Sequence, residues 1–261
     1  KQMTAALDVS AQIFVPISVG LSILGWSSFG TWAIGTQLVL TAAFYMICAE
    51  LRNFDQSDIE VAYLAAATTI FPIGFALVLH SRHLASWVIA LILLVIAAAY
   101  VAGDKFAPEA RHKPIYASLA VIIALISPLI VFDGRQGTYL AIGSAFVLLA
   151  QYVLTRRKEV YAAFLLVLSV LPYVIVSFVL PVSWSLWQVA LLYAALAIPM
   201  TLVGHFVLRR RDRGSADAQI LTVVIWTIAA SVAAYVFDFK EWSTPVLALS
   251  SVSYLAIALL D

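Results

Sequence analysis

Long stretches without a charged side chain dominate this chain, and only short polar loops separate them. Hydrophobic residues make up 64% of the 261 residues and charged residues 11%, whereas an average soluble domain carries roughly 25% charged residues. A helix needs roughly 20 mostly apolar residues to cross a bilayer. The pattern therefore predicts an integral membrane protein whose helices leave no room for a soluble catalytic module within these residues.

We expect an all-α fold, a polytopic integral membrane helical bundle with about ten transmembrane helices in tandem hairpin repeats. Residues 1–261 are expected to form a single transmembrane domain. Its hairpins are expected at about 11–50, 59–102, 114–155, 160–208 and 219–260. The start at Lys1 and the end at Asp261 favour a piece of a longer membrane protein.

The basic residues predict the orientation. Of the 15 Lys and Arg residues, only Arg82, Arg135 and Lys240 fall in the loops predicted on one side. The other twelve fall on the opposite side: Lys1, Arg52, Lys105, Arg111, Lys113, Arg156, Arg157, Lys158, Arg209, Arg210, Arg211 and Arg213. Short basic loops stay in the cytoplasm. We therefore expect a multi-pass protein of a cell membrane, the bacterial inner membrane, with both ends of the segment cytoplasmic.

Two of these basic runs have a second interpretation. Arg156, Arg157 and Lys158 form one run, and the other contains Arg209, Arg210, Arg211 and Arg213. Each is first a topology signal, but basic residues at the membrane surface also attract anionic lipid headgroups, with roughly 1 kcal/mol per residue. The lipid bilayer is thus the expected partner, with other membrane proteins as further candidates. A net charge of +1 gives no indication of nucleic-acid binding.

A proline recurs in the first four helices that are predicted to run outward. The four are Pro16, Pro72, Pro128 and Pro172, at intervals of 56, 56 and 44 residues. Such spacing is typical of a tandem array of one supersecondary unit, here a transmembrane hairpin. Each proline removes a backbone hydrogen bond and kinks its helix. The kinks either shape helix packing or open a cavity, and the sequence leaves both possibilities open.

One hairpin resembles a known type of protein. It runs from Leu125-Ile126-Ser127-Pro128-Leu129 through Asp133-Gly134-Arg135 to Arg156-Arg157-Lys158. This segment resembles the repeated hairpins of bacterial polytopic "predicted membrane proteins" of unknown function, which are built from tandem transmembrane hairpins. The resemblance covers mainly residues 114–175. It implies a fold but no established activity, and it assigns no catalytic or binding residues.

Sites of chemistry are not apparent in the sequence. Every Asp, Glu, Lys and Arg lies in a loop, at a terminus or near a predicted helix end, whereas ion-coupled carriers usually keep a charged group or a broken helix at the midplane. We expect no catalytic residue, no cofactor and no metal ion. His80 and His83 in one outer loop are the metal candidates that we considered. They would need a third ligand such as Asp133 or Asp238.

These observations favour a non-enzymatic membrane segment that acts as a scaffold or as the membrane component of an envelope or assembly system. One alternative is a secondary transporter or carrier of a neutral or lipid-like small molecule. Another is the membrane part of a lipid or glycan enzyme whose active site lies outside this fragment. A polar cavity at mid-depth would identify the transporter, and an attached catalytic domain would identify the enzyme.

Overall fold

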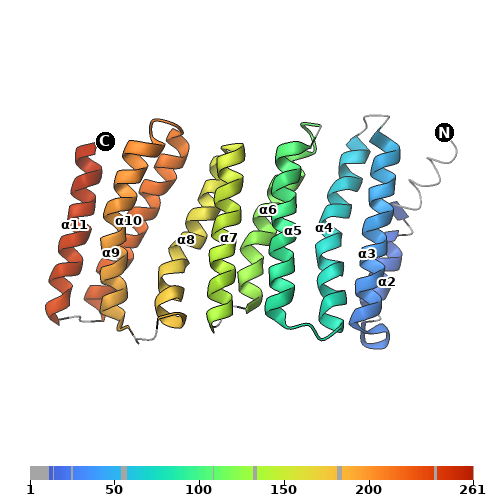
Figure 1. Cartoon of the computed structure of the whole chain (residues 1–261), viewed down its shortest axis with the longest axis horizontal. Coiled ribbons are helices and arrows are strands. Elements are labelled where there is room, and N and C mark those ends of the chain that lie inside the picture. Colours follow the sequence, from blue (N-terminus) through green and yellow to red (C-terminus); the bar gives the residue numbers. More distant parts are fainter. Residues whose placement is uncertain are drawn as a thin grey trace. The chain divides into compact units, whose positions relative to one another are not determined.

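The computed structural model describes residues 12–13, 15–24, 26–53, 58–107, 109–131, 134–180, 184–237 and 240–260, and these residues form helices joined by short loops (Figure 1). No strand occurs in these ranges, which confirms the all-α fold class. The α-helices are α2 (Val15–Leu24), α3 (Trp26–Asn53), α4 (Asp58–Ser81), α5 (Ser86–Phe106), α6 (Lys113–Ile126), α7 (Gly134–Thr155), α8 (Lys158–Phe178), α9 (Leu186–Val203), α10 (Arg213–Val236) and α11 (Ser243–Leu260). Shorter helical segments are η2 (Ser127–Val131), η3 (Gly204–Leu208) and η4 (Lys240–Trp242).

Eight spans in the described part of the chain are long and apolar enough to cross a membrane. Seven include α4 to α10, two of them extended by η2 and η3, and the eighth is the Gly30–Leu51 part of α3. The apolar segment Ser243–Ala258 of α11 is shorter than the roughly 20 residues that a crossing needs. The chain is thus a multi-pass membrane protein, with eight full-length spans in its described residues against an expectation of about ten in the whole sequence.

The chain divides into two compact units, unit 1 (Lys1–Ile130) and unit 2 (Val131–Asp261). The boundary falls within the hairpin expected at 114–155. Neighbouring helices within each unit run in opposite directions (Figure 1). In unit 1 the closest packing occurs within the pairs α3–α4 and α5–α6, and in unit 2 α7 packs on α8 while α9, α10 and α11 pack on one another.

This packing is shifted by one helix from the hairpins that the prolines suggested. The expected hairpins 59–102 and 160–208 join α4 to α5 and α8 to α9, and both of these contacts are sparse. The closely packed pairs α5–α6, α7–α8 and α9–α10 are instead joined by the loops rich in Lys and Arg. Tyrosine pairs lie between the helices of α3–α4, α5–α6 and α7–α8, and a cluster of alanines lies between α9 and α10.

Two glycines bring α3 and α4 into backbone contact. A Cβ atom on Gly35 would lie 2.8 Å from Val78 N, and one on Gly74 would lie 2.7 Å from Leu38 Cβ. Helices in lipid gain no hydrophobic driving force from one another, so they associate through close van der Waals packing that small residues permit. The pair α3–α4 therefore depends on the absence of side chains at these two positions.

Unit 2 achieves the same close approach with alanine. Ala190 and Ala194 of α9, Ala230 and Ala234 of α10 and Val246 of α11 form one buried cluster. Alanine has the highest helix propensity, whereas glycine weakens a helix by about 1 kcal/mol. Unit 1 also buries alanines, among them Ala90, Ala97 and Ala120, so small residues pack the cores of both units.

The four prolines occupy different positions in their helices. Pro72 and Pro172 lie inside α4 and α8. Pro16 is the second residue of α2, where its missing N–H needs no helical partner. Pro128 lies in η2, the 3₁₀ turn that follows α6. A further proline, Pro199, lies inside α9 shortly before the π-helical segment η3.

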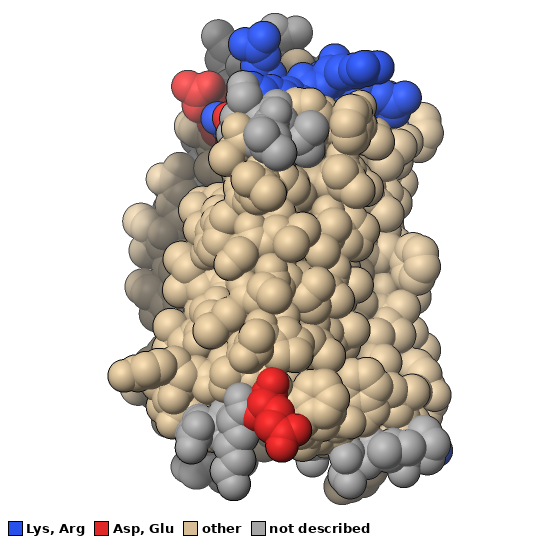
Figure 2. Space-filling model, turned by 90° about the vertical axis from the view of Figure 1, so that its left-hand side faces the viewer, with Lys and Arg blue, Asp and Glu red and all other residues tan. Residues whose placement is uncertain are grey.

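Each unit has a basic end, which we define as the end where its Lys- and Arg-rich loops lie. In unit 1 this end includes the loop between α5 and α6, and in unit 2 it includes the loops α7–α8 and α9–α10. Figure 2 shows Lys and Arg atoms gathered at one end of the visible face, Asp and Glu atoms near both ends, and neither kind over the middle. Such a band of uncharged surface is typical of a lipid-facing wall.

Candidate functional site

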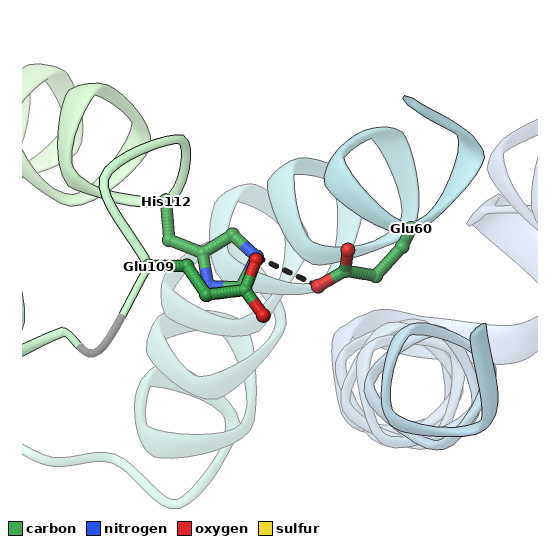
Figure 3. A group of neighbouring side chains, drawn as sticks. All are labelled: Glu60, Glu109 and His112. Carbon is green, nitrogen blue, oxygen red and sulfur yellow. Dashed lines mark hydrogen bonds and ion pairs between the residues drawn. The ribbon is translucent and has the colours of Figure 1, made fainter. Parts of the chain in front are cut away.

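A cluster of ionisable side chains lies at the basic end of unit 1. Glu60 is the third residue of α4, while Glu109, Arg111 and His112 belong to the loop between α5 and α6. A backbone hydrogen bond from His112 N to Glu109 O, 3.2 Å long, closes a turn from which both side chains project. Figure 3 shows the side chains of Glu109 and His112 directed toward Glu60.

His112 lies between the two carboxylates. Its Nε2 atom is 2.6 Å from Glu60 Oε1 and 3.7 Å from Glu109 Oε2. The shorter of the two contacts is a hydrogen bond between the His112 and Glu60 side chains. The histidine therefore links the loop between α5 and α6 to the beginning of α4.

Arg111 contacts both carboxylates from the same loop. Its Nε donates to Glu109 Oε2 over 2.5 Å, and its Nη2 forms an ion pair with Glu60 Oε2. The hydrogen bond to Glu109 is the main cause that raises the pKa of the Arg111 guanidinium, and the negative charges of Glu109, Glu60 and Asp58 add to it. Arg111 thus acts as the counter-ion of the cluster.

The cluster is largely shielded from solvent. The Glu60 side chain is 2% exposed and that of Arg111 27% exposed, and His112 is buried. Within the part of the chain that the structure describes, Glu60 Oε2 and Arg111 Nη2 are buried without a hydrogen bond of good geometry. A buried carboxylate is costly unless it is paired and hydrogen-bonded. One oxygen of Glu60 is therefore held by charge alone.

Tyrosine pairs support this end of unit 1. The rings of Tyr45 and Tyr63 stack between α3 and α4 with centroids 5.8 Å apart, and those of Tyr100 and Tyr116 meet between α5 and α6 at 5.9 Å. Cys48 is buried in the first of these contacts. The aromatic pairs join the two members of each close helix pair, and Tyr63 lies one helical turn beyond Glu60 on α4.

The basic end of unit 2 repeats the tyrosine pair but not the charged cluster. Tyr152 of α7 and Tyr161 of α8 lie with ring centroids 4.6 Å apart. The Tyr161 hydroxyl donates to Gln219 Oε1 of α10, and Gln219 Nε2 donates to the Met200 carbonyl of α9 over 2.6 Å. A neutral hydrogen-bonded chain therefore joins three helices of unit 2.

Asp212 begins α10 at the same end. Its carboxylate accepts hydrogen bonds from the Ser215 hydroxyl at 2.5 Å and from the Ser215 backbone N–H at 3.4 Å. These bonds, the hydroxyl bond foremost, lower the pKa of the Asp212 carboxyl below its usual value. The residue is a helix N-cap of the kind that satisfies free N–H groups in the first turn.

Several polar side chains within the described helices make internal hydrogen bonds. Ser169 of α8 receives the Trp226 indole N–H at its hydroxyl over 2.9 Å, and its carbonyl receives the Tyr193 hydroxyl over 2.6 Å. Thr68 and Ser127 donate to carbonyls of their own helical turns. These hydroxyl groups are thus occupied inside the protein.

A partly open, mostly apolar cavity lies among the described residues of each unit. The cavity in unit 1, about 430 Å³, lies between α4, α5 and α6, and Pro72, Ile89 and Ile123 form part of its wall. Its polar lining comes from Thr69, His80 and Ser86. The cavity in unit 2, about 360 Å³, is bordered by Ser169, Tyr193 and Trp226 among apolar residues of α9 and α10. Both volumes fall within the usual range of small-molecule sites.

The two histidines considered as metal candidates lie away from the cluster. His80 borders the cavity of unit 1, and His83 is exposed in the loop between α4 and α5, with a positive φ of 57°. Their suggested partners Asp133 and Asp238 lie outside the described residues. The basic runs at 156–158 and 209–213 lie in or next to loops of unit 2, as expected.

Sequence reasoning did not identify the cluster of Glu60, Glu109 and His112. In the sequence, Glu60 indicated only an acidic residue near a predicted helix end, and Arg111 indicated only the membrane orientation. The ligand atoms of Glu60, Glu109 and His112 all lie within 4.8 Å of one another. His112 and Glu60 are 52 residues apart in sequence, so no local sequence motif predicts their contact. The pair Glu109 and His112, three residues apart in a loop, was the available signal.

Comparisons of this chain with protein-family models, with curated proteins and with solved structures found no match.

Proposed function

We propose that this chain is a non-enzymatic multi-pass segment that acts as a membrane scaffold, as a component of an envelope or assembly system. The observation that carries the proposal is that several polar groups in the described helices make internal hydrogen bonds. Trp226 and Tyr193 both donate to Ser169, and Thr68 and Ser127 donate to carbonyls of their own helices. A carrier for a polar substrate would need such groups free to bind it.

The basic ends support the same function. A charged cluster joins α4 to the α5–α6 loop in unit 1, and the Tyr161–Gln219–Met200 chain joins three helices in unit 2. Alternating-access carriers rock one helical bundle against another. Side-chain links at the helix ends oppose such movement within a unit and suit a protein that holds a fixed shape.

The second candidate function is a carrier of a neutral or lipid-like molecule, and the two apolar cavities favour it. Their walls suit an acyl chain, since apolar surface in a cavity is the usual binding surface for apolar ligands. The cavity in unit 1 also offers His80 and Ser86 near the end of α4 and the beginning of α5, where a headgroup would reach the membrane surface.

Two measurements separate these functions. Extraction of native membranes with an amphipathic polymer should yield the protein in a stoichiometric complex with another membrane protein, which is the result that a scaffold predicts. Reconstituted alone, it should move fluorescent phospholipid across vesicles no faster than empty vesicles do. A protein that is extracted alone and accelerates lipid transfer in vesicles would contradict the scaffold and favour the carrier.

We also propose that both basic ends face the cytoplasm of a bacterial inner membrane, because short basic loops are retained there. Ala110 lies exposed in the α5–α6 loop and Ala85 lies exposed just before α5. After Cys48 is replaced by alanine, an impermeant thiol reagent should label Ala85→Cys in intact cells and Ala110→Cys only after lysis. The reverse labelling would invert the orientation.

A further inference from the structure

We propose that Glu60, Glu109 and His112 form a binding site for a divalent transition-metal ion, with Zn²⁺ as the fitting cation. The site links the first turn of α4 to the turn before α6. Its three potential ligand atoms lie within 4.8 Å of one another, and Figure 3 shows the three side chains converging from these two segments. This inference is independent of the proposed scaffold function.

The donor set suits this class of metal. Imidazole nitrogen binds Zn²⁺, and carboxylate oxygen completes many of its sites at about 2.0–2.2 Å. Neighbouring ligands of a tetrahedral ion then lie about 3.3–3.5 Å apart. His112 Nε2 lies 2.6 Å from Glu60 Oε1 and 3.7 Å from Glu109 Oε2. The first distance must lengthen and the second shorten, each by less than about 1 Å.

The burial of Glu60 is the second observation that indicates a ligand. Its side chain is 2% exposed, yet its Oε2 atom makes no hydrogen bond within the described part of the chain. A carboxylate in such surroundings is normally hydrogen-bonded at both oxygens or coordinated to a metal. The free acceptor capacity of Oε2 is directed into the cluster, where the ion pair with Arg111 provides charge but no well-directed hydrogen bond.

Charge also favours a divalent ion. With a neutral imidazole, the two carboxylates bring a charge of −2, of which Arg111 compensates one unit. A divalent cation would compensate both. Arg111 is 27% exposed, so its guanidinium can turn toward solvent when a metal takes its place. Arg111 is therefore an internal competitor for the metal, and this role distinguishes a metal site from a simple ion-pair cluster.

The test is calorimetric titration of the purified full chain in detergent with ZnCl₂, with MgCl₂ as a second titrant. The expected result is saturable binding of one Zn²⁺ per chain and no comparable binding of Mg²⁺, which keeps its waters and prefers oxygen ligands. Glu109→Gln and His112→Gln should each weaken Zn²⁺ binding by about tenfold or more. Arg111→Gln should strengthen it severalfold, because the competing cation is gone.

His83→Gln is the matched control, since it removes an exposed histidine from another loop and should leave the affinity unchanged. Glu109 is 30% exposed, so its replacement by the similar glutamine is the variant least expected to disturb folding. Circular dichroism confirms that each variant is folded before titration. Three results would overturn the metal site: no saturable Zn²⁺ binding by the parent chain, equal binding by Glu109→Gln and His112→Gln, or an Arg111→Gln variant that binds as weakly as Glu109→Gln.

Discussion

The basic ends of the two units join their helices with different chemistry. Unit 1 uses buried charges, Glu60 against Arg111 and His112, whereas unit 2 uses the neutral chain from Tyr161 through Gln219 to the Met200 carbonyl. Both rest beside a tyrosine pair between two closely packed helices. The comparison shows that the aromatic pair belongs to the shared hairpin architecture, while the polar link beside it differs between the units.

This difference has an energetic consequence. Removing one partner of a buried ion pair leaves an uncompensated charge and costs about 3–5 kcal/mol, whereas removing one partner of a neutral hydrogen bond costs about 1–3 kcal/mol. A charged link is therefore the more fragile of the two when it is broken. The charged link is also the one in which a metal ion can take the place of Arg111 as the cation beside the carboxylates.

The largest effect is expected for Glu60→Ala. Arg111 can reach solvent and His112 cannot, so the cost should lie near the lower end of the range for a buried pair, about 3 kcal/mol. Unfolding by SDS, followed by circular dichroism, reports on both units and measures the change in stability. Glu159→Ala is the control, because Glu159 is the exposed second residue of α8. It should change stability by under about 0.5 kcal/mol.

Equal losses of stability in Glu60→Ala and Glu159→Ala would contradict the charged link. They would mean that the buried cluster contributes no more than an acidic residue in the first turn of any helix.

The next effect concerns the close contact between α3 and α4 at Gly74 in unit 1. Gly74→Ala should destabilise the α3–α4 pair by about 2–3 kcal/mol, because the new Cβ would lie 2.7 Å from Leu38 Cβ and 2.9 Å from the Val39 nitrogen. Gly20→Ala in α2 meets no atom within 4 Å and should be neutral or stabilising. Unfolding by SDS, followed by circular dichroism, measures both, and a neutral Gly74→Ala would show that α3 and α4 can separate without loss.

Part of this fold was predictable from the sequence. The length of the apolar segments predicted a helical membrane protein, and the described helices confirm it. The packing partners were not predictable from local patterns, because the contact of Gly35 with Val78 and the stacking of Tyr45 on Tyr63 depend on which faces of two helices meet. The prolines indicated hairpins whose connecting loops lie at the end opposite to the basic loops. A proline affects the conformation of its own helix and carries no information about which helix packs against it.

The candidate site was hidden for a related reason. Glu60 and Arg111 have ordinary roles at membrane helix ends, as a first-turn acid and as a basic loop residue. Only the folded arrangement places them with His112 in one buried cluster. The sequence alone does not show that Glu60 is buried, because its burial depends on the loop that covers the beginning of its helix.

A smaller effect is expected for the neutral link of unit 2. Gln219→Leu should cost about 1–2 kcal/mol, because the buried Tyr161 hydroxyl loses its acceptor. The double variant Tyr161→Phe with Gln219→Leu removes both partners and should be more stable than Gln219→Leu alone. Unfolding by SDS, followed by circular dichroism, measures the difference. A double variant less stable than the single one would show that packing, rather than the hydrogen bond, decides stability here.

The smallest effect is expected for the helix cap at Asp212. Asp212→Ala should cost about 0.5–1 kcal/mol at pH 7, since the cap is partly exposed. The folded structure lowers the pKa of this carboxyl, so its contribution is present above the ordinary carboxyl pKa and is lost as the pH falls through the folded value. The parent and Asp212→Ala should therefore differ in SDS unfolding at pH 7 and converge at strongly acidic pH. Asp212→Asn retains an N-cap acceptor and should lie close to the parent at pH 7. A constant difference between parent and Asp212→Ala at both pH values would show that the ionised carboxylate is not what stabilises the start of α10.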